Sequence, residues 1–83
     1  MSWTVYIIEA SDNSLYTGIS TDVERRWLEH VSGKAGAKYF RGRTPQKLVY
    51  QEAASDRSIA SQREAAIKKM TRQQKLAMIN AQQ

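Results

Sequence analysis

Cysteine is absent from the chain, which excludes disulfide bonds and any structural zinc site built on thiolates. A chain without cysteine suits a reducing compartment, and we expect a cytoplasmic protein. The sequence also has no apolar run near the roughly 20 residues that a membrane-spanning helix requires. Its N-terminus lacks the basic start and apolar stretch of a signal peptide, so we expect no membrane association.

The chain has 83 residues and is too short for a second hydrophobic core, so we expect a single domain over residues 1–83. Apolar residues make up 41% of it and charged residues 25%. This balance is typical of soluble globular proteins and too apolar for a disordered chain. We expect a monomer or a weak homo-oligomer.

Acidic residues are missing from two stretches of a chain whose net charge is +5. None lies between His30 and Gln51, and none follows Glu64. The basic residues of these stretches are Lys34, Lys38, Arg41, Arg43 and Lys47, then Lys68, Lys69, Arg72 and Lys75. Basic blocks interleaved with Tyr39 and Phe40 suit a phosphate backbone with stackable bases. A solvated basic surface without a partner is the alternative.

The first 19 residues favour a β-hairpin, because strand-like runs over residues 5–8 and 15–19 flank the turn-forming residues 11–14. If residues 11–13 form a three-residue loop, Asn13 takes the left-handed backbone position that asparagine tolerates. A two- or four-residue loop is the alternative. The choice matters because a shift of one residue moves every side chain to the opposite face.

The three-residue loop places Tyr6 opposite Gly18 and Ile8 opposite Tyr16. Both tyrosines then share one face as diagonal neighbours, about 7–8 Å apart at the backbone. The glycine opposite Tyr6 leaves space there for a ligand. The other face would carry Trp3, Val5, Ile7, Leu15 and Ile19, which form a credible core.

A helix is predicted to begin at Asp22, capped by Ser20 or Thr21, and to end near Gly33. Its expected apolar stripe consists of Val23, Trp27, Leu28 and Val31. Arg26 and His30 lie one turn apart on a flank of that stripe. Residues 33–45 indicate a loop.

The second half of the chain favours one strand and two helices. Residues 46–52 suit a strand, with Leu48 and Tyr50 on one side and Val49 on the other. A helix opens at residue 55 or 56 and runs to about residue 70. A second capping box, at residues 71–74, then begins a terminal helix. The resulting order is β-β-α-β-α-α, and a three-stranded antiparallel sheet packed by helices is the simplest way to bury these stripes. The fold class is thus α/β, of the α+β type.

Five residues now form a pattern of order and spacing. Thr4-Val5-Tyr6 and Tyr16-Thr17-Gly18 lie in the two hairpin strands, and Arg26, His30 and a helical Glu64 follow. In this pattern the chain resembles the GIY-YIG nuclease superfamily, and in particular its small standalone bacterial members of the YhbQ type. The resemblance covers nearly the whole chain. It departs from the family name at two positions, where threonine replaces the glycine of the first motif and the isoleucine of the second.

The resemblance implies that Tyr6 and Tyr16 are catalytic, with Tyr6 as the general base or base relay for an attacking water and Tyr16 positioning water or phosphate. Taken alone, either tyrosine is more readily explained as a half-buried strand residue. A phenol with a pKa near 10 is a poor base at neutral pH unless nearby groups favour the phenolate. The roles of the two tyrosines can also be exchanged.

Arg26 is the expected phosphate ligand of this site, and His30 is expected either to accept a proton from Tyr6 or to bind the phosphate. Arginine binds a phosphate bidentately and stabilises charge that develops in the transition state. Histidine titrates near neutral pH, which suits it to accept a proton from Tyr6. The alternatives are a surface ion pair between Arg26 and Asp22, and a helix histidine without a role.

Glu64 is the expected ligand of a single Mg²⁺ or Mn²⁺ ion. Magnesium keeps most of its waters and often takes only one or two protein carboxylates, with phosphate providing another oxygen. The alternative is an ion pair with Lys68, one helical turn further on. We expect no other cofactor.

The sequence therefore predicts a divalent-metal-dependent endonuclease that hydrolyses DNA phosphodiester bonds in structure-related DNA processing or repair. Its nucleic-acid contacts are predicted at Lys34, Lys38, Tyr39, Arg41 and Arg43. One alternative is a nucleic-acid-binding module that keeps the nuclease fold but cleaves little by itself. Another is a protein-interaction domain.

Overall fold

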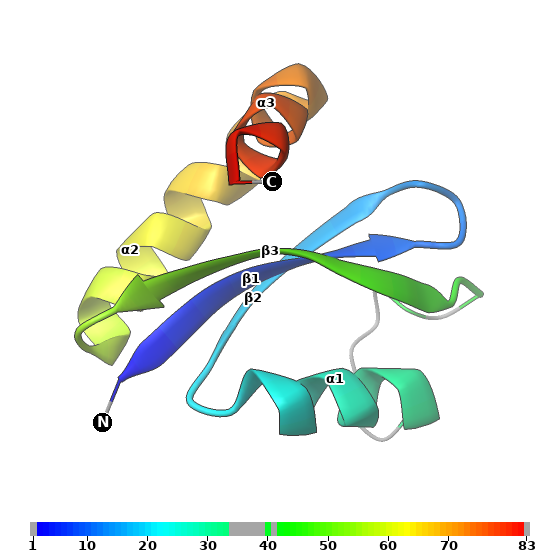
Figure 1. Ribbon diagram of the computed structural model, residues 1–83, viewed down its shortest axis with the longest axis horizontal. Coiled ribbons are helices and arrows are strands. Elements are labelled where there is room, and N and C mark those ends of the chain that lie inside the picture. The colour runs from blue at the N-terminus through cyan, green and yellow to red at the C-terminus, as the bar shows by residue number, and fades with distance from the viewer. Residues whose placement is uncertain (1, 34–39, 41, 83) are drawn as a thin grey trace.

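The computed structural model describes residues 2–33, 40 and 42–82. These residues form three strands and three helices in the predicted order β-β-α-β-α-α (Figure 1). The elements are β1 (Trp3–Ala10), β2 (Leu15–Ser20), α1 (Val23–Ser32), β3 (Pro45–Ala54), α2 (Arg57–Lys68) and α3 (Arg72–Gln82). Within the described ranges, no helix has the length and apolar character needed to cross a membrane.

The strands form one antiparallel sheet in the order β2-β1-β3, which confirms the predicted fold class. Helices cover both faces: α1 lies on one side of the sheet, and α2 and α3 lie on the other (Figure 1). The central strand β1 is therefore apolar on both faces, and residues 5–8 are all buried. This explains why Val5-Tyr6-Ile7-Ile8 is a continuous apolar run rather than an alternating one.

The hairpin has the register that the three-residue loop predicts. Tyr6 pairs with Gly18 and Ile8 pairs with Tyr16. Asn13 is left-handed, with φ of 68°, and the Ala10 amide donates to the Ser14 carbonyl at 2.9 Å. Both tyrosines consequently lie on the α1 side of the sheet.

The main core lies between the sheet and the helices α2 and α3. Its buried members come from β1, β3 and both helices: Val5, Ile7, Tyr50, Ala54, Ala60, Ile67 and Ile79. Trp3, Leu15 and Ile19 pack against them, as the hairpin register requires. This face stabilises the fold, and the opposite face is left for the polar side chains of α1.

The prediction that Leu48 and Tyr50 lie on the same face of β3, with Val49 on the other, is wrong. Tyr50 pairs with Ile7, whereas Leu48 pairs with Ile8, so that Val49 is an extra residue in a β-bulge. Because Ile7 and Ile8 lie on opposite faces of β1, Leu48 and Tyr50 do as well. A bulge inserts one residue and breaks the alternation on which the prediction depended.

Helix α1 begins one residue later than predicted and buries a different face. Its N-cap is Asp22, whose side chain accepts from the Arg25 amide, rather than Ser20 or Thr21. Leu28 and Val31 are 65% and 51% exposed, although both belonged to the expected apolar stripe. The C-terminus is as predicted, with Gly33 in the left-handed conformation.

The caps of the last two helices agree with the sequence. Asp56 caps α2 by accepting from the Ile59 amide at 2.9 Å. Thr71 and Gln74 form a reciprocal capping box at the start of α3, with donor–acceptor distances of 2.9 and 3.2 Å. These caps fix the corner between α2 and α3, where the chain turns within a few residues.

We predict that Thr17→Val stabilises the protein by about 1 kcal/mol, because a buried hydroxyl without a partner costs free energy that an isosteric methyl group does not. Thr17 is 3% exposed, and its Oγ1 has no hydrogen-bond partner within the described residues. Urea unfolding measures the change. Thr4→Val is the matched control, because Thr4 is only half-buried. A destabilised Thr17→Val protein would contradict this account.

Candidate active site

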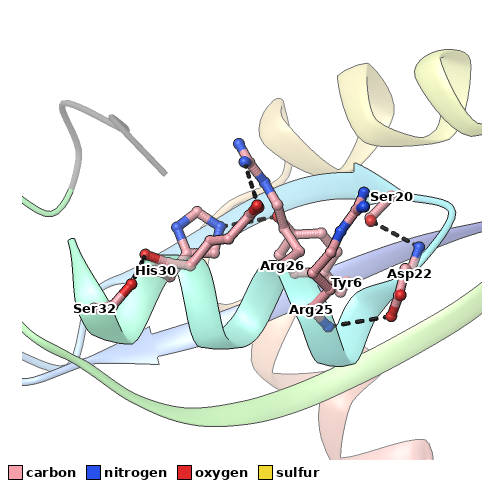
Figure 2. Close-up of polar contacts among 8 residues, drawn as sticks. Tyr6, Ser20, Asp22, Arg25, Arg26, His30 and Ser32 are labelled. Carbon is pink, nitrogen blue, oxygen red and sulfur yellow. Dashed lines mark hydrogen bonds and ion pairs between the residues drawn. The ribbon is translucent and has the colours of Figure 1, made fainter. Parts of the chain in front are cut away.

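The site is organised by a buried hydrogen bond between β1 and α1. The hydroxyl of Tyr6 and Nε2 of His30 are 3.0 Å apart, and the two residues are 2% and 3% exposed. Tyr6 reaches this position because the hairpin register turns it toward α1. Figure 2 shows His30 and Arg26 on consecutive turns of α1, beside Tyr6.

Gly18 is required for the position of the Tyr6 ring. A Cβ atom at residue 18 would lie 2.6 Å from the Tyr6 hydroxyl and 2.7 Å from Cζ, closer than real atoms approach. The phenol therefore passes directly over the glycine opposite it. The predicted space for a ligand at Gly18 is filled by Tyr6 itself, which corrects that expectation.

Two further rings surround the imidazole. The Tyr16 ring centroid lies 6.4 Å from that of Tyr6 and 5.3 Å from that of His30. Phe40 lies beside both Tyr16 and His30, with centroid distances of 5.1 and 5.0 Å. The aromatic contacts bury His30 and hold Tyr16 next to the polar pair.

Arg26 supplies the positive charge of the site. Its Nη1 pairs with Oε1 of Glu29 at 3.1 Å, and its side chain stays 34% exposed. Glu29, rather than the expected alternative Asp22, is the acidic partner. The guanidinium also acts on Tyr6, since hydrogen bonding to Arg26 and its charge both lower the pKa of the phenol.

Burial outweighs that effect and, with the nearby Tyr16, raises the pKa of Tyr6 to about 12. Burial also lowers the pKa of His30, and the charge of Arg26 lowers it further. Both groups are therefore neutral near pH 7. Because the phenol keeps its proton at neutral pH, we assign it as the donor of this hydrogen bond, with Nε2 of His30 as the acceptor. Nδ1 of His30 has no hydrogen-bond partner in the described part of the chain.

Glu64 lies on α2, which packs on the other side of the sheet from α1. Among the influences on the pKa of Tyr6, the charge of Glu64 is the smallest, and it raises that pKa. Its Oε2 also contacts Nζ of Lys68 at 3.4 Å, the alternative that the helical spacing allowed. The described residues contain no cluster of three histidine or acidic side chains. A single hard carboxylate oxygen fits Mg²⁺ or Mn²⁺ when substrate and water provide the remaining ligands.

The predicted basic contacts are described only in part. Lys34, Lys38, Tyr39 and Arg41 lie outside the described residues. Arg43 is described, and its Nε pairs with Asp12 in the hairpin turn at 3.0 Å. The Ser11 amide also donates to the Thr44 carbonyl, at 2.8 Å. The chain before β3 is thus joined to the hairpin that carries both tyrosines.

Sequence reasoning missed two residues of the site, Glu29 and Phe40. Glu29 was detectable, because it lies three residues after Arg26 on the same helix, a spacing at which ion pairs form. Phe40 was noted only as a stackable aromatic. Its contact with Tyr16 and His30 depends on how residues distant in sequence come together, which no local pattern shows.

The chain matches the model of the GIY-YIG catalytic domain over residues 2–77. It is 48% identical over 80 residues to a UPF0213 protein of Desulfotalea psychrophila, covering 96% of this chain and 73% of that one. It is 47% identical over 77 residues to the UPF0213 protein YhbQ of Escherichia coli, a match that covers 93% of this chain and 76% of that protein. The chain therefore belongs to the GIY-YIG family, which carries a nuclease fold. Within that family its relatives are the YhbQ-like UPF0213 proteins.

Solved structures agree with the fold. The chain is 43% identical to a UPF0213 protein of Bacillus halodurans solved by NMR, with a TM-score of 0.62 over 98% of this chain and 85% of that one. It is 37% identical to a protein of E. faecalis that was also solved by NMR. The TM-score is 0.65, and the match covers 99% of this chain and 88% of that one.

We predict that His30 titrates below its ordinary pKa of about 6.5. Because the folded state disfavours its charged form, the associated stability is complete above about pH 6.5 and is lost as the pH falls toward the folded pKa. NMR titration is unambiguous, since His30 is the only histidine of the chain. Urea unfolding between pH 7.5 and 5.5 should show a weaker pH dependence in His30→Gln. A pKa at or above the ordinary value would refute the prediction.

Proposed function

We propose that the protein is a metal-dependent endonuclease that hydrolyses DNA phosphodiester bonds, with Tyr6, Tyr16, Arg26, His30 and Glu64 as its catalytic residues. The observation that carries the proposal is the Tyr6–His30 hydrogen bond, with Arg26 and the ring of Tyr16 beside it. Membership of the GIY-YIG family supports it. Action in DNA processing or repair is part of the same proposal.

Proton transfer in this mechanism runs from water through Tyr6 to His30. As the attacking water forms a bond to phosphorus, the phenol oxygen takes the water's proton and the phenol gives its own proton to Nε2. The phenolate therefore never accumulates, which suits a tyrosine whose pKa is about 12. A neutral imidazole is the acceptor that this route requires, and burial keeps His30 neutral. Tyr16, beside His30, would position the water or the phosphate.

Arg26 would bind the scissile phosphate through its guanidinium and stabilise the charge that grows as the new bond forms. Glu29 orients the guanidinium and leaves part of it exposed for that contact. The bond to the leaving oxygen breaks on the side opposite the attacking water, and that oxygen takes a proton from solvent. Glu64 would hold a single Mg²⁺ or Mn²⁺ ion, and Lys68 would give up the carboxylate to it. When bound, the ion supplies positive charge to the phosphate and leaving oxygens.

We expect Glu64→Ala to abolish metal-dependent cleavage, because the ion would lose its protein ligand. Purified protein is incubated with branched, nicked, single-stranded and duplex DNA, with Mg²⁺ or Mn²⁺. Glu24→Ala is the control, since Glu24 is an exposed acid in the first turn of α1. Equal cleavage by the wild type and Glu64→Ala would rule out the mechanism.

We expect Arg26→Ala to lower the cleavage rate about 100-fold or more, the usual cost of losing a charge that stabilises a transition state. Arg25→Ala is a closely matched control, because Arg25 is the adjacent arginine and is exposed. Single-turnover kinetics at saturating DNA separate this effect from weaker binding. If the two variants cleave at the same rate, Arg26 has no catalytic role.

A second candidate is a nucleic-acid-binding module with the nuclease fold and little cleavage of its own. It is favoured by the burial of Tyr6 and by the contact of Glu64 with Lys68, which leave the acid and base groups engaged with the protein itself. Fluorescence anisotropy, which measures DNA binding, separates the binding module from the enzyme when it is combined with the cleavage assay. Salt-sensitive DNA binding without turnover in any metal supports the module and contradicts the enzyme.

A further inference from the structure

A basic surface occupies the corner between α2 and α3, outside the site described above. Its residues are Lys68, Lys69, Arg72 and Lys75. The Lys68 side chain is 56% exposed, Lys69 and Arg72 are exposed, and Lys75 is partly exposed. No acidic residue follows Glu64 in the sequence, and Glu64 itself pairs with Lys68.

The corner surface contacts Glu64 and the hairpin turn. Lys68 contacts Glu64, the proposed metal ligand, at 3.4 Å. Arg72 donates from Nη1 to the carbonyl oxygen of Asn13 at 2.6 Å, in the hairpin turn just before Tyr16. These contacts join the basic corner to the proposed metal ligand and to the hairpin turn.

Lys68 and Arg72 make contacts within the fold, so the charge left for a ligand is mainly that of Lys69 and Lys75. Among the described residues, neither Lys69 nor Lys75 takes part in an ion pair. Helix α3 has no acid in its first turn and begins with Arg72, although the positive end of a helix dipole disfavours a cation there. Like charges in neighbouring turns repel one another, so the arrangement costs stability unless an anion binds.

We propose that the corner surface binds the phosphate backbone of a nucleic acid beside Glu64. The inference rests on the proposed function in taking a nucleic acid as the partner, and it adds a binding surface to the one predicted before β3. Spaced lysines without acids between them match a repeating row of phosphates. Because the contacts are to phosphates, binding at this surface is independent of base sequence.

The test measures DNA binding in EDTA, so that it does not depend on cleavage or on metal. Fluorescence anisotropy with a labelled duplex compares the wild type with the double variant Lys69→Gln, Lys75→Gln. These two residues are chosen because neither contacts Glu64 or the hairpin turn. We expect affinity to fall about tenfold or more at low salt. The slope of log K against log salt concentration should become shallower by about 1.8, for two phosphate contacts.

The matched control is the double variant Arg25→Gln, Arg57→Gln, which removes the same charge from exposed positions on α1 and α2. Thermal melts establish that both variants are folded. We expect the control to change affinity less than about threefold. Equal losses in the two variants, no loss in the first, or no DNA binding by the wild type would each overturn the proposal. A wild type that binds through this surface but never cleaves would contradict the enzyme and leave the surface established.

Discussion

The hydrogen bond between Tyr6 and His30 is the interaction on which the candidate site depends. It joins the central strand to α1, and it forms only because three separate conditions hold. The left-handed Asn13 sets the hairpin register, the register places Gly18 opposite Tyr6, and the missing side chain at Gly18 lets the phenol lie across the strand. A change in any one of these would separate the phenol from the imidazole.

The electrostatics of the site follow from the same burial. A phenol and an imidazole removed from water are both held neutral, and the nearby Arg26 opposes protonation of His30 while favouring the phenolate of Tyr6. At rest the proton therefore stays on the phenol, and its transfer to Nε2 requires the attacking water to give up its own proton in the same step. The charged groups, Arg26 and Glu64, remain partly exposed, where a phosphate and a cation can reach them.

The hairpin, its register and the helix caps at Asp56 and Thr71 could be predicted because each depends on local chemistry that a few residues specify. The family pattern also named the residues that the structure brings together around Tyr6. The orientation of α1 could not be read in this way: hydrophobic periodicity favoured burial of Leu28 and Val31, whereas the polar face carrying Arg26 and His30 turns toward the tyrosines. The bulge at Val49 and the contact of Phe40 with His30 depend on pairing and packing between distant segments, which local patterns do not encode.

The most direct test of this account is the tautomer of His30, read from the nitrogen chemical shifts of its ring at neutral pH. The account predicts a neutral imidazole with hydrogen on Nδ1 and an unprotonated Nε2 that accepts from Tyr6, and a clear shift of Nε2 in Tyr6→Phe. A hydrogen on Nε2, or ring shifts that are unchanged in Tyr6→Phe, would contradict the proposed route of the proton.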